Sequence, residues 1–322
     1  SAPPDPSSTR NQPMRRIALA TWCDLPELSE DDQLLLAPLE QRGIRAEPVV
    51  WNDPGVTWDR FEAVVVRSCW DYHHRHDDFL EWTESLERLG VPLWNPALVL
   101  RWNAEKSYLN HLQNNGIPVV PTRWIEAGSG LTLAVLMEET GWDDVVVKPT
   151  ISASAHNTWR TSRTRAAKDG ARFGALAARS ALMLQPFVDE VASEGEWSLV
   201  FLGGAFSHAV MKRPRPGDFR VQPEHGGTVD PVEAGAELIN AAQAALQAIP
   251  GEWLYARVDG CLMDGRFCIT EVELVEPSLF LITSPGAPDR AADAIEAALG
   301  LRPGRPLEGR EALRGTDRPP MS

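Results

Sequence analysis

The stretch TEVELVEPS, residues 270–278, places two carboxylates in a segment flanked by the apolar runs GRFCI and SLFLI. If it forms a strand, Glu271 and Glu273 point to one face, about 6.6 Å apart. Buried like charges this close are costly unless they are compensated, and a divalent cation with oxygen ligands would compensate them. An exposed edge strand with a solvated acidic face explains the pair equally well at this point.

A hairpin signal adds a third acid. The runs WLYARVDGCLM and GRFCITEVEL flank Asp264-Gly265, a dipeptide typical of a two-residue hairpin turn. Antiparallel pairing around this turn brings Asp259 within reach of Glu271. Three carboxylates on one face predict a hard-cation site, most economically Mg²⁺ bridging nucleotide phosphates. Arg257 alternates with Asp259 and is placed to share its face.

Candidate ligand-binding cations occur in three places along this acidic chain. Lys148 ends an apolar strand and Lys106 lies on a polar helix, where a lysine usually just extends to solvent. The loop TISASAHNT, 150–158, has small and hydroxyl side chains that let backbone N–H groups approach phosphates, although it contains no glycine. The third place is a cluster that indicates either an acidic ligand or a solvated loop: Lys212, Arg213, Arg215 and Arg220.

The segment RSCWDYHHRH, 67–76, follows a predicted strand, and ligands of open α/β sheets lie beyond the carboxyl ends of strands. A zwitterionic substrate could be held there by Arg67, Trp70, Asp71 and Tyr72. Asp24, after the first strand, is either a substrate contact or an acid near a helix N-terminus. The adjacent histidines of this segment are expected to diverge, and no Cys or HExxH partner is present, so the pattern disfavours zinc.

Length, net charge and cysteine content limit the class of protein to which this chain can belong. The chain has 322 residues and a net charge of −14, which argues against nonspecific binding to nucleic acid or anionic membranes. Its four cysteines include no CxxC pair, which indicates buried thiols in a reducing cytoplasm. No apolar run approaches the roughly 20 residues of a membrane span, and the N-terminus lacks an apolar signal core. We find no GxxxxGK, GxGxxG or GxSxG motif.

The elements that must position these residues follow from periodicity. Strands are predicted at 15–20, 47–51 and 62–68, with helices at 29–43 and 77–90, a pattern typical of a parallel sheet with crossovers. A helix over 103–116 capped by Asn103, a helix over 131–141 and a strand over 144–150 follow, whereas 151–170 shows no periodicity. The remainder is predicted to be antiparallel, with a helix opening at Asp230-Pro231 and a last helix over 288–300.

In their order, these pieces resemble the ATP-grasp superfamily, in the branch of prokaryotic glutathione synthetase and the ribosomal S6 glutamate ligases, over about residues 15–300. The phrases RSCWDYHHR, RWNAEKSYL, VVKPTISA and TEVELVEPSLFL look closest to the O-ureido-D-serine cyclo-ligases of the cycloserine pathway. The resemblance implies an α/β (α+β) ATP-grasp fold. Its expected parts are a disordered arm 1–14, a parallel pre-ATP-grasp substrate domain 15–105, a central lid subdomain 106–188, an antiparallel C-terminal subdomain 189–301 and a loose tail 302–322.

The same resemblance implies residue roles. Lys106, Lys148 and the Ser152 loop would contact ATP phosphates, Gln185, Pro186, Phe187 and Val188 would form the adenine hinge, and Glu196 would hold the ribose. Lys212 would face the γ-phosphate and Arg220 would stabilise an acyl-phosphate. Asp259, Glu271 and Glu273 would hold two Mg²⁺ ions, although glutathione synthetase has asparagine at the last position.

The function implied is an ATP-dependent carboxylate–amine ligase that forms an amide through an acyl-phosphate, by ring closure of an O-ureido-serine-like amino acid. Two alternatives stay open: an intermolecular amino-acid or peptide ligase, and an ATP-binding module without ligase chemistry. A small amino-acid-like substrate, no nucleic-acid or membrane partner, a cytoplasmic location and a possible homodimer complete the expectation.

Overall fold

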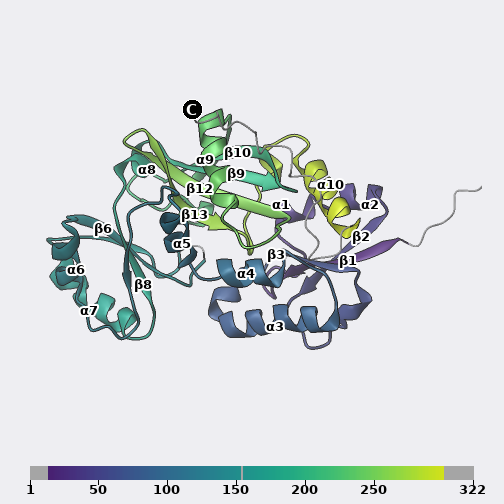
Figure 1. Ribbon diagram of the computed structural model, residues 1–322, viewed down its shortest axis with the longest axis horizontal. Helices are drawn as coiled ribbons and strands as arrows, with labels where there is room; N and C mark the ends of the chain where they lie inside the picture. Colours follow the sequence, from purple (N-terminus) through teal and green to yellow (C-terminus); the bar gives the residue numbers. More distant parts are fainter. Residues whose placement is uncertain (1–13, 154, 301–322) are drawn as a thin grey trace, which may run out of the picture.

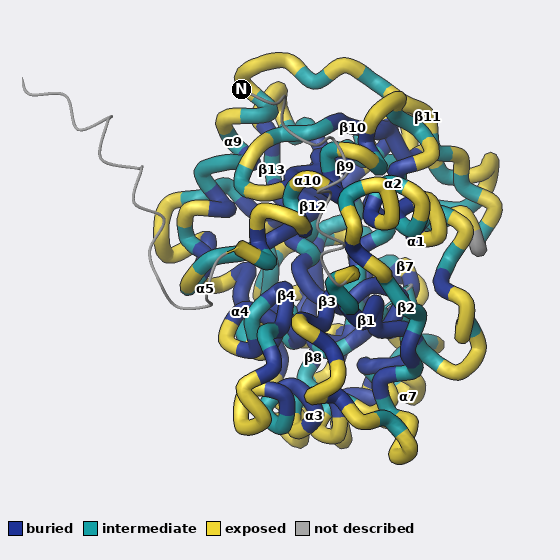
Figure 2. The backbone as a smooth tube through the Cα atoms, turned by 90° about the vertical axis from the view of Figure 1, so that its right-hand side faces the viewer, coloured by how far each residue is buried: buried dark blue, intermediate teal, exposed yellow. Residues whose placement is uncertain are grey.

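The computed structural model describes residues 14–153 and 155–300, so the predicted arm (except Met14) and tail lie outside the described residues. Three sheets make up this part of the chain, each from a different sequence region (Figure 1). Figure 2 shows that β1 and β3 of the N-terminal sheet are buried, whereas the exposed backbone gathers in loops and outer helices. In the described residues no helix is long and apolar enough to cross a membrane.

The N-terminal sheet is parallel, as predicted, with the order β2-β1-β3-β4. Its strands are β1 (Arg15–Thr21), β2 (Ile44–Val50), β3 (Ala63–Ser68) and β4 (Leu93–Trp94). Every residue of β3 is buried, which is the pattern of a strand covered on both faces. Helix α3 (His76–Leu89) packs on the sheet through its predicted stripe, which includes Phe79 and Leu86.

The helix predicted over 29–43 is divided into α1 (Glu30–Gln33) and α2 (Leu36–Gln41). Ser29 caps the first piece, since its Oγ accepts a hydrogen bond from the Asp32 N–H at 3.2 Å. Pro38 explains the break, because a proline ring clashes with the carbonyl four residues earlier, here that of Leu34. The chain therefore restarts its helix so that Pro38 lies in the first turn of α2.

The central sheet is antiparallel, with the order β5-β8-β6-β7. It consists of β5 (Arg123–Ile125), β6 (Asp144–Pro149), β7 (Trp159–Ser162) and β8 (Leu182–Pro186). Helices α6 (Leu133–Thr140) and α7 (Ala166–Ala177) pack on it through Leu136 and Phe173. Within 151–170, where the sequence shows no periodicity, the structure has β7 and the start of α7. β7 is a four-residue edge strand, too short to give a clear pattern.

The C-terminal sheet is antiparallel, with the order β11-β10-β9-β12-β13. Its strands are β9 (Glu196–Leu202), β10 (Ala205–Arg213), β11 (Thr228–Val232), β12 (Tyr255–Met263) and β13 (Arg266–Glu273). Helix α8 (Asp189–Ser193) precedes β9, and α9 (Ala236–Leu246) packs on the sheet. Helix α10 (Ala287–Gly300) joins this sheet to the N-terminal one, because Ile295 shares a buried cluster with Leu19 of β1 and Leu202 of β9.

Two predicted helix starts are wrong. Asp230-Pro231 lies in β11, an edge strand where the missing proline N–H is tolerated, and the helix begins only at Ala236. Asn103 does not cap a helix over 103–116 but ends α4 (Ala97–Asn103), and α5 (Tyr108–Asn114) follows. Its amide donates to the Val272 carbonyl and accepts from the Leu274 N–H, both at 2.7 Å, so it ties α4 to β13.

Candidate active site

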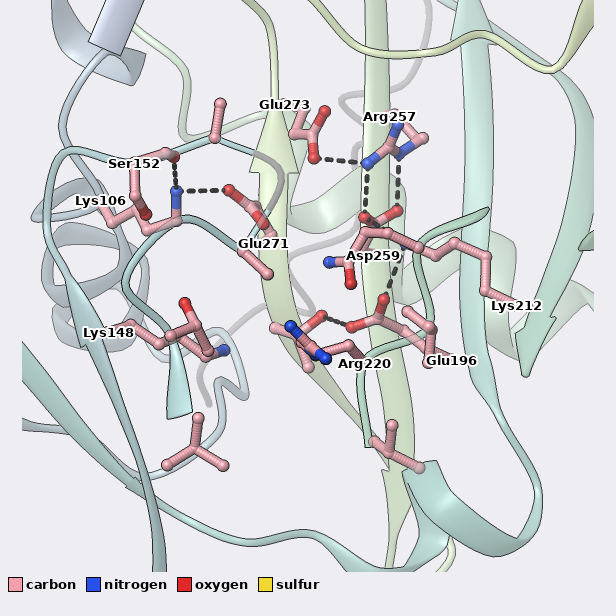
Figure 3. Close-up of a pocket in the computed structure, with 18 of the residues that line it drawn as sticks. Lys106, Lys148, Ser152, Glu196, Lys212, Arg220, Arg257, Asp259, Glu271 and Glu273 are labelled. Carbon is pink, nitrogen blue, oxygen red and sulfur yellow. Dashed lines mark hydrogen bonds and ion pairs between the residues drawn. The ribbon is translucent and has the colours of Figure 1, made fainter. Parts of the chain in front are cut away.

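A cavity of about 550 Å³ lies where the central and C-terminal sheets face each other, with part of the N-terminal domain at one end. Residues of all three regions line it, among them Trp70, Lys148 and Glu271. Figure 3 shows charged side chains from the two sheets pointing toward one another in this cavity. The sequence-predicted groups are therefore largely brought to one place.

The predicted hairpin is present, and it pairs Asp259 with Glu271 and Arg257 with Glu273. One carboxylate oxygen from each of Asp259, Glu271 and Glu273 lies within 4.8 Å of the others. β13 is an edge strand in the sheet, as one alternative held, but both of its acids line the cavity. The cluster suits a hard cation, because it offers only oxygen donors at close range.

Two cations hold Asp259, which is 2% exposed. Arg257 donates to it from Nε at 2.9 Å and from Nη2 at 2.8 Å, and Lys212 Nζ lies 2.8 Å from Oδ2. Ser198 adds a hydrogen bond of 2.6 Å (Figure 3). Burial would raise the pKa of Asp259, but Arg257 and Lys212 outweigh it and hold the pKa well below its usual value. Asp259 is therefore ionised at neutral pH.

The negative charges of Glu271 and Glu273, the two acids of β13, are less fully compensated by cations than that of Asp259. Lys106 Nζ lies 2.8 Å from Glu271 and also donates to the Ser152 carbonyl at 2.7 Å. Glu273 pairs with Nη2 of Arg257, which it shares with Asp259. Burial raises the pKa of Glu273 to about 8 against the effect of Arg257, and Glu271 adds to the rise. A carboxyl that resists ionisation next to two other acids indicates excess negative potential, which a divalent cation would relieve.

Lys148 lines the cavity, and the described residues give it no ion-pair partner. In the described residues no carboxylate lies within ion-pair distance of its ammonium group, and Figure 3 shows it pointing into the cavity without an interaction drawn to it. Burial lowers its pKa, while the more distant Glu271 and Glu196 act in the opposite direction. A partly buried, unpaired lysine is costly, so the site is suited to an anionic ligand.

The predicted hinge, residues 185–188, consists of the last two residues of β8 and the two residues after it, and it lines the cavity. Phe187 and Val188, together with Val120, Val146 and Val191, form an apolar wall. Gln185 donates its side-chain amide to Thr122 Oγ1 at 2.9 Å. A flat apolar ring with polar edges fits such a wall.

Glu196, the first residue of β9, also lines the cavity. Its carboxylate accepts from Thr270 Oγ1 at 2.6 Å and lies 2.7 Å from Lys212 Nζ. Burial would lower the Lys212 pKa, but the carboxylates of Asp259 and Glu196 outweigh it and raise the pKa. Lys212 therefore stays charged and links the two acids.

The predicted cationic cluster separates into two groups. Lys212 and Arg220 line the cavity, whereas Arg213 and Arg215 are exposed outside it. Asp218 fixes Arg220 with two hydrogen bonds, at 3.1 Å from Nε and 2.8 Å from Nη2. Asp218 therefore fixes the orientation of the Arg220 guanidinium where it lines the cavity.

The candidate substrate residues also divide. Trp70 and Tyr72 line the cavity, whereas Arg67, Asp71 and Asp24 do not. Arg67 is 1% exposed and donates to Asp32 at 2.9 Å and to the Pro277 carbonyl at 2.6 Å. Asp71 accepts from the Trp51 indole at 2.8 Å, and Asp24 is exposed. The structure thus gives Arg67 and Asp71 internal partners instead of cavity positions.

Two charged residues of the cavity were not among the sequence-predicted site residues. Arg257 contacts both Asp259 and Glu273, and its alternation with Asp259 was the available signal. Glu276, in the turn after β13, also lines the cavity, and burial raises its pKa to about 7 against the effect of Lys106. Nothing in its spacing from Glu273 marked Glu276, because it lies beyond the strand.

The fold is that of the ATP-grasp ligases. A D-alanine–D-alanine ligase from Bacillus anthracis, solved in complex with ATP, matches with a TM-score of 0.65 at 17% identity, over 89% of this chain and 98% of that chain. An ATP-grasp RimK domain protein from Sphaerobacter thermophilus matches with a TM-score of 0.63 at 18% identity, over 87% of this chain and 99% of that one.

The chain belongs to the D-cycloserine synthetase DcsG family. It is 33% identical to the cycloserine biosynthesis protein DcsG of Streptomyces lavendulae over 300 residues, which are 88% of this chain and 98% of that protein. A crystal structure of D-cycloserine synthetase DcsG matches with a TM-score of 0.79 at 32% identity, over 88% of this chain and 99% of that chain. The family profile of the DcsG N-terminal domain matches residues 17–95.

The predicted resemblance and fold class are thus confirmed. The protein is an ATP-dependent ligase of the C–N bond-forming ATP-grasp class, which rules against an ATP-binding module without chemistry.

Proposed function

We propose that this ligase closes the ring of an O-ureido-serine-like amino acid. The substrate carboxylate attacks the γ-phosphorus of ATP, and ADP leaves. A nitrogen of the same molecule then attacks the resulting acyl-phosphate carbonyl, and phosphate leaves as the amide forms. The observation that carries the proposal is the meeting, in one cavity, of the unpaired Lys148 with the cluster of Asp259, Glu271 and Glu273. The product named for the relatives at 32–33% identity, D-cycloserine, supports ring closure.

ATP has a complementary surface along this cavity. The apolar wall at Phe187 and Val188 suits adenine, and the hinge backbone suits its polar edge. Glu196 would hold the ribose hydroxyls, while Lys106, Lys148 and the loop at Ser152 would hold the phosphates. Lys212, tied to Glu196 and Asp259, would face the γ-phosphate. Positioning of this kind supplies most of the catalysis in phosphoryl transfer.

Asp259, Glu271 and Glu273 would hold Mg²⁺, in our proposal two ions. When bound, Mg²⁺ supplies charge neutralisation on the phosphates and on the leaving oxygen. The carboxylates now contact Lys106 and Arg257, so these two cations would be freed toward the phosphate and the acyl group. This exchange keeps every charge in the buried site compensated.

Arg220 and Arg257 would stabilise the negative charge of the acyl-phosphate and of the tetrahedral adduct that follows. A donor already fixed before the reaction is effective because it needs no reorganisation, and Asp218 fixes Arg220 in this way. Trp70 and Tyr72 would hold the amino acid at the N-terminal end of the cavity, with Glu276 beside them for its ammonium group. The Trp70 indole already donates to the Glu276 carbonyl at 3.3 Å.

An intermolecular ligase remains a second candidate, because the fold also matches a D-alanine–D-alanine ligase. Mg²⁺-dependent ADP release, measured over a panel of amino acids with and without added amines, separates the two. Ring closure predicts release with O-ureido-serine alone. A strict need for an acid and a separate amine would overturn ring closure.

The remaining expectations belong to this proposal as well. All four cysteines are free, which supports a reducing, cytoplasmic location. We retain a small amino-acid-like substrate, no nucleic-acid or membrane partner, and a homodimer as expectations. Size-exclusion chromatography with light scattering tests the homodimer.

A further inference from the structure

A cluster of three histidines lies outside the carboxylate site. His73 and His74 belong to the short 3-10 helix η2 (Tyr72–His74), which follows β3 in the N-terminal domain. His156 comes from the loop after β6 in the central domain, of which residues 150–153 and 155–158 are described. The cluster thus joins two domains at the mouth of the ATP cavity, since Tyr72, Ala155 and Thr158 line that cavity.

The three rings face one another closely. Ring centroids are 3.8 Å apart for His73 and His74, 5.1 Å for His74 and His156, and 5.5 Å for His73 and His156. One nitrogen from each ring lies within 4.8 Å of the other two. The sequence-based expectation that adjacent histidines diverge is therefore wrong here, because η2 turns both rings toward the loop of the neighbouring domain.

His73 has a ring nitrogen that is available to a ligand. His73 Nδ1 is buried and has no hydrogen-bond partner among the described residues. Two histidines outside the cluster have local partners, since His76 contacts Asp77 and His111 contacts Asn115.

We propose that His73, His74 and His156 form a binding site for a borderline transition-metal ion such as Zn²⁺, Ni²⁺ or Co²⁺, distinct from the Mg²⁺ site. Imidazole donors favour these ions, whereas Mg²⁺ takes oxygen ligands. Zn–N bonds of about 2.0–2.1 Å in tetrahedral geometry place the donors about 3.4 Å apart. Rotation of the exposed rings of His74 and His156 closes the small remaining difference. Three protein ligands leave a coordination position for water.

A metal ion bound at this site would hold the loop that carries His156 against the N-terminal domain. The loop carries Ser152, whose carbonyl accepts from Lys106, and it walls the cavity next to Trp70 and Tyr72. Fixing it to η2 restricts the exit of ADP and product. The ion therefore acts as an inhibitor of turnover, and it takes no part in the chemistry.

The test is a titration of the full-length protein with Zn²⁺ by calorimetry, in saturating Mg²⁺ so that the carboxylate site is filled. We expect one equivalent to bind, with a loss of affinity of at least about 100-fold in the H74A/H156A double variant, because losing a ligand costs more than losing the partner that orients one. Co²⁺ in place of Zn²⁺ should give the intense visible absorption of a four-coordinate, nitrogen-ligated ion.

His111→Ala is the matched control, since His111 is an exposed histidine outside the cluster and its variant should bind Zn²⁺ normally. Both His74 and His156 are exposed, so their replacement should leave the fold and the metal-free turnover unchanged. Hydrogen exchange should slow at residues 155–158 when Zn²⁺ is added to the native protein, and ADP release should slow with the same half-saturation. Equal Zn²⁺ affinity in the native protein and the double variant, or no binding in either, would overturn the proposal.

Discussion

Arg257 and Asp259, two residues apart on β12, form a bidentate ion pair within the cavity, with donor–acceptor distances of 2.9 and 2.8 Å. The same guanidinium also pairs with Glu273, directly across the hairpin. Arg257 thus connects two of the three candidate metal ligands. In our proposal, Arg257 would change between a ligand-free state, in which it neutralises acids, and a loaded state, in which it would face the reacting acyl group.

Arg257→Lys tests this relationship. Lysine keeps the charge but cannot make two parallel hydrogen bonds to a carboxylate. We expect the turnover number to fall by about 100-fold, as for loss of one oxyanion donor, while the fold is retained. Steady-state ADP release and circular dichroism check this. Arg213→Lys, on an exposed arginine that pairs with Asp230, is the control. Undiminished turnover in Arg257→Lys would remove Arg257 from the reaction.

Glu271→Gln removes one negative oxygen donor but keeps the size of the side chain. We expect turnover to be abolished with little loss of thermal stability, because relief of repulsion from Glu273 offsets the lost contact with Lys106. ADP release at saturating Mg²⁺ and a melting curve provide the two readouts. A variant with normal turnover would contradict the metal role of Glu271.

The pH dependence of stability tests the charge excess at Glu273. Its pKa is raised to about 8 in the folded protein, against about 4.3 in an unfolded chain. The folded state thus binds more protons than the unfolded state between these values, so the free energy of unfolding should fall as pH rises from about 5 to about 8. Chemical denaturation of the ligand-free protein measures this slope.

Two changes should flatten that slope. Saturating Mg²⁺ with a non-hydrolysable ATP analogue compensates Glu273, and Glu273→Gln removes the titrating group. Calorimetry should also detect proton release on Mg²⁺ binding near neutral pH. A slope that is the same in Glu273→Gln and the native protein would assign the pH dependence to other groups.

Lys148→Met tests the unpaired lysine. Because the ammonium has no carboxylate partner among the described residues, we expect the variant to melt no lower than the native protein. The KM for ATP should rise at least tenfold, about 1.4 kcal/mol of lost binding. Lys168→Met, on an exposed lysine of α7, is the control for general loss of charge. An unchanged KM for ATP would exclude Lys148 from phosphate binding.

Local signals were sufficient for the hairpin that carries the acids. Asp264 and Gly265 have φ values of 51° and 75°, the positive values that a type I′ turn requires, and this turn sets the pairs from Met263–Arg266 to Gly260–Ile269. A β-bulge between Asp259 and Gly260, which the sequence did not indicate, then shifts the register by one residue, so that Asp259 pairs with Glu271. Likewise, the buried apolar strands and the stripe of α3 followed from periodicity. Such features depend on neighbours within a few residues.

Features that depend on distant partners were missed. Asn103 looked like a helix cap, but its amide is used by the backbone of β13, and Pro231 lies in an edge strand only because β10 pairs with it. Arg67 was predicted to contact the substrate. In the structure its guanidinium instead donates to Asp32 and to the carbonyl of Pro277, near the end of the segment 270–278. The histidine cluster needs His156 of another domain, which no local spacing could indicate.

The central claim is ligation through an acyl-phosphate within one substrate molecule. It is tested most directly by mass spectrometry of the products formed from O-ureido-serine labelled with ¹⁸O in its carboxylate, with ATP and Mg²⁺ and no added amine. We expect a ring-closed product, ADP in equal amount, and one ¹⁸O atom transferred to inorganic phosphate. Unlabelled phosphate, or no product until a second amine is added, would contradict it.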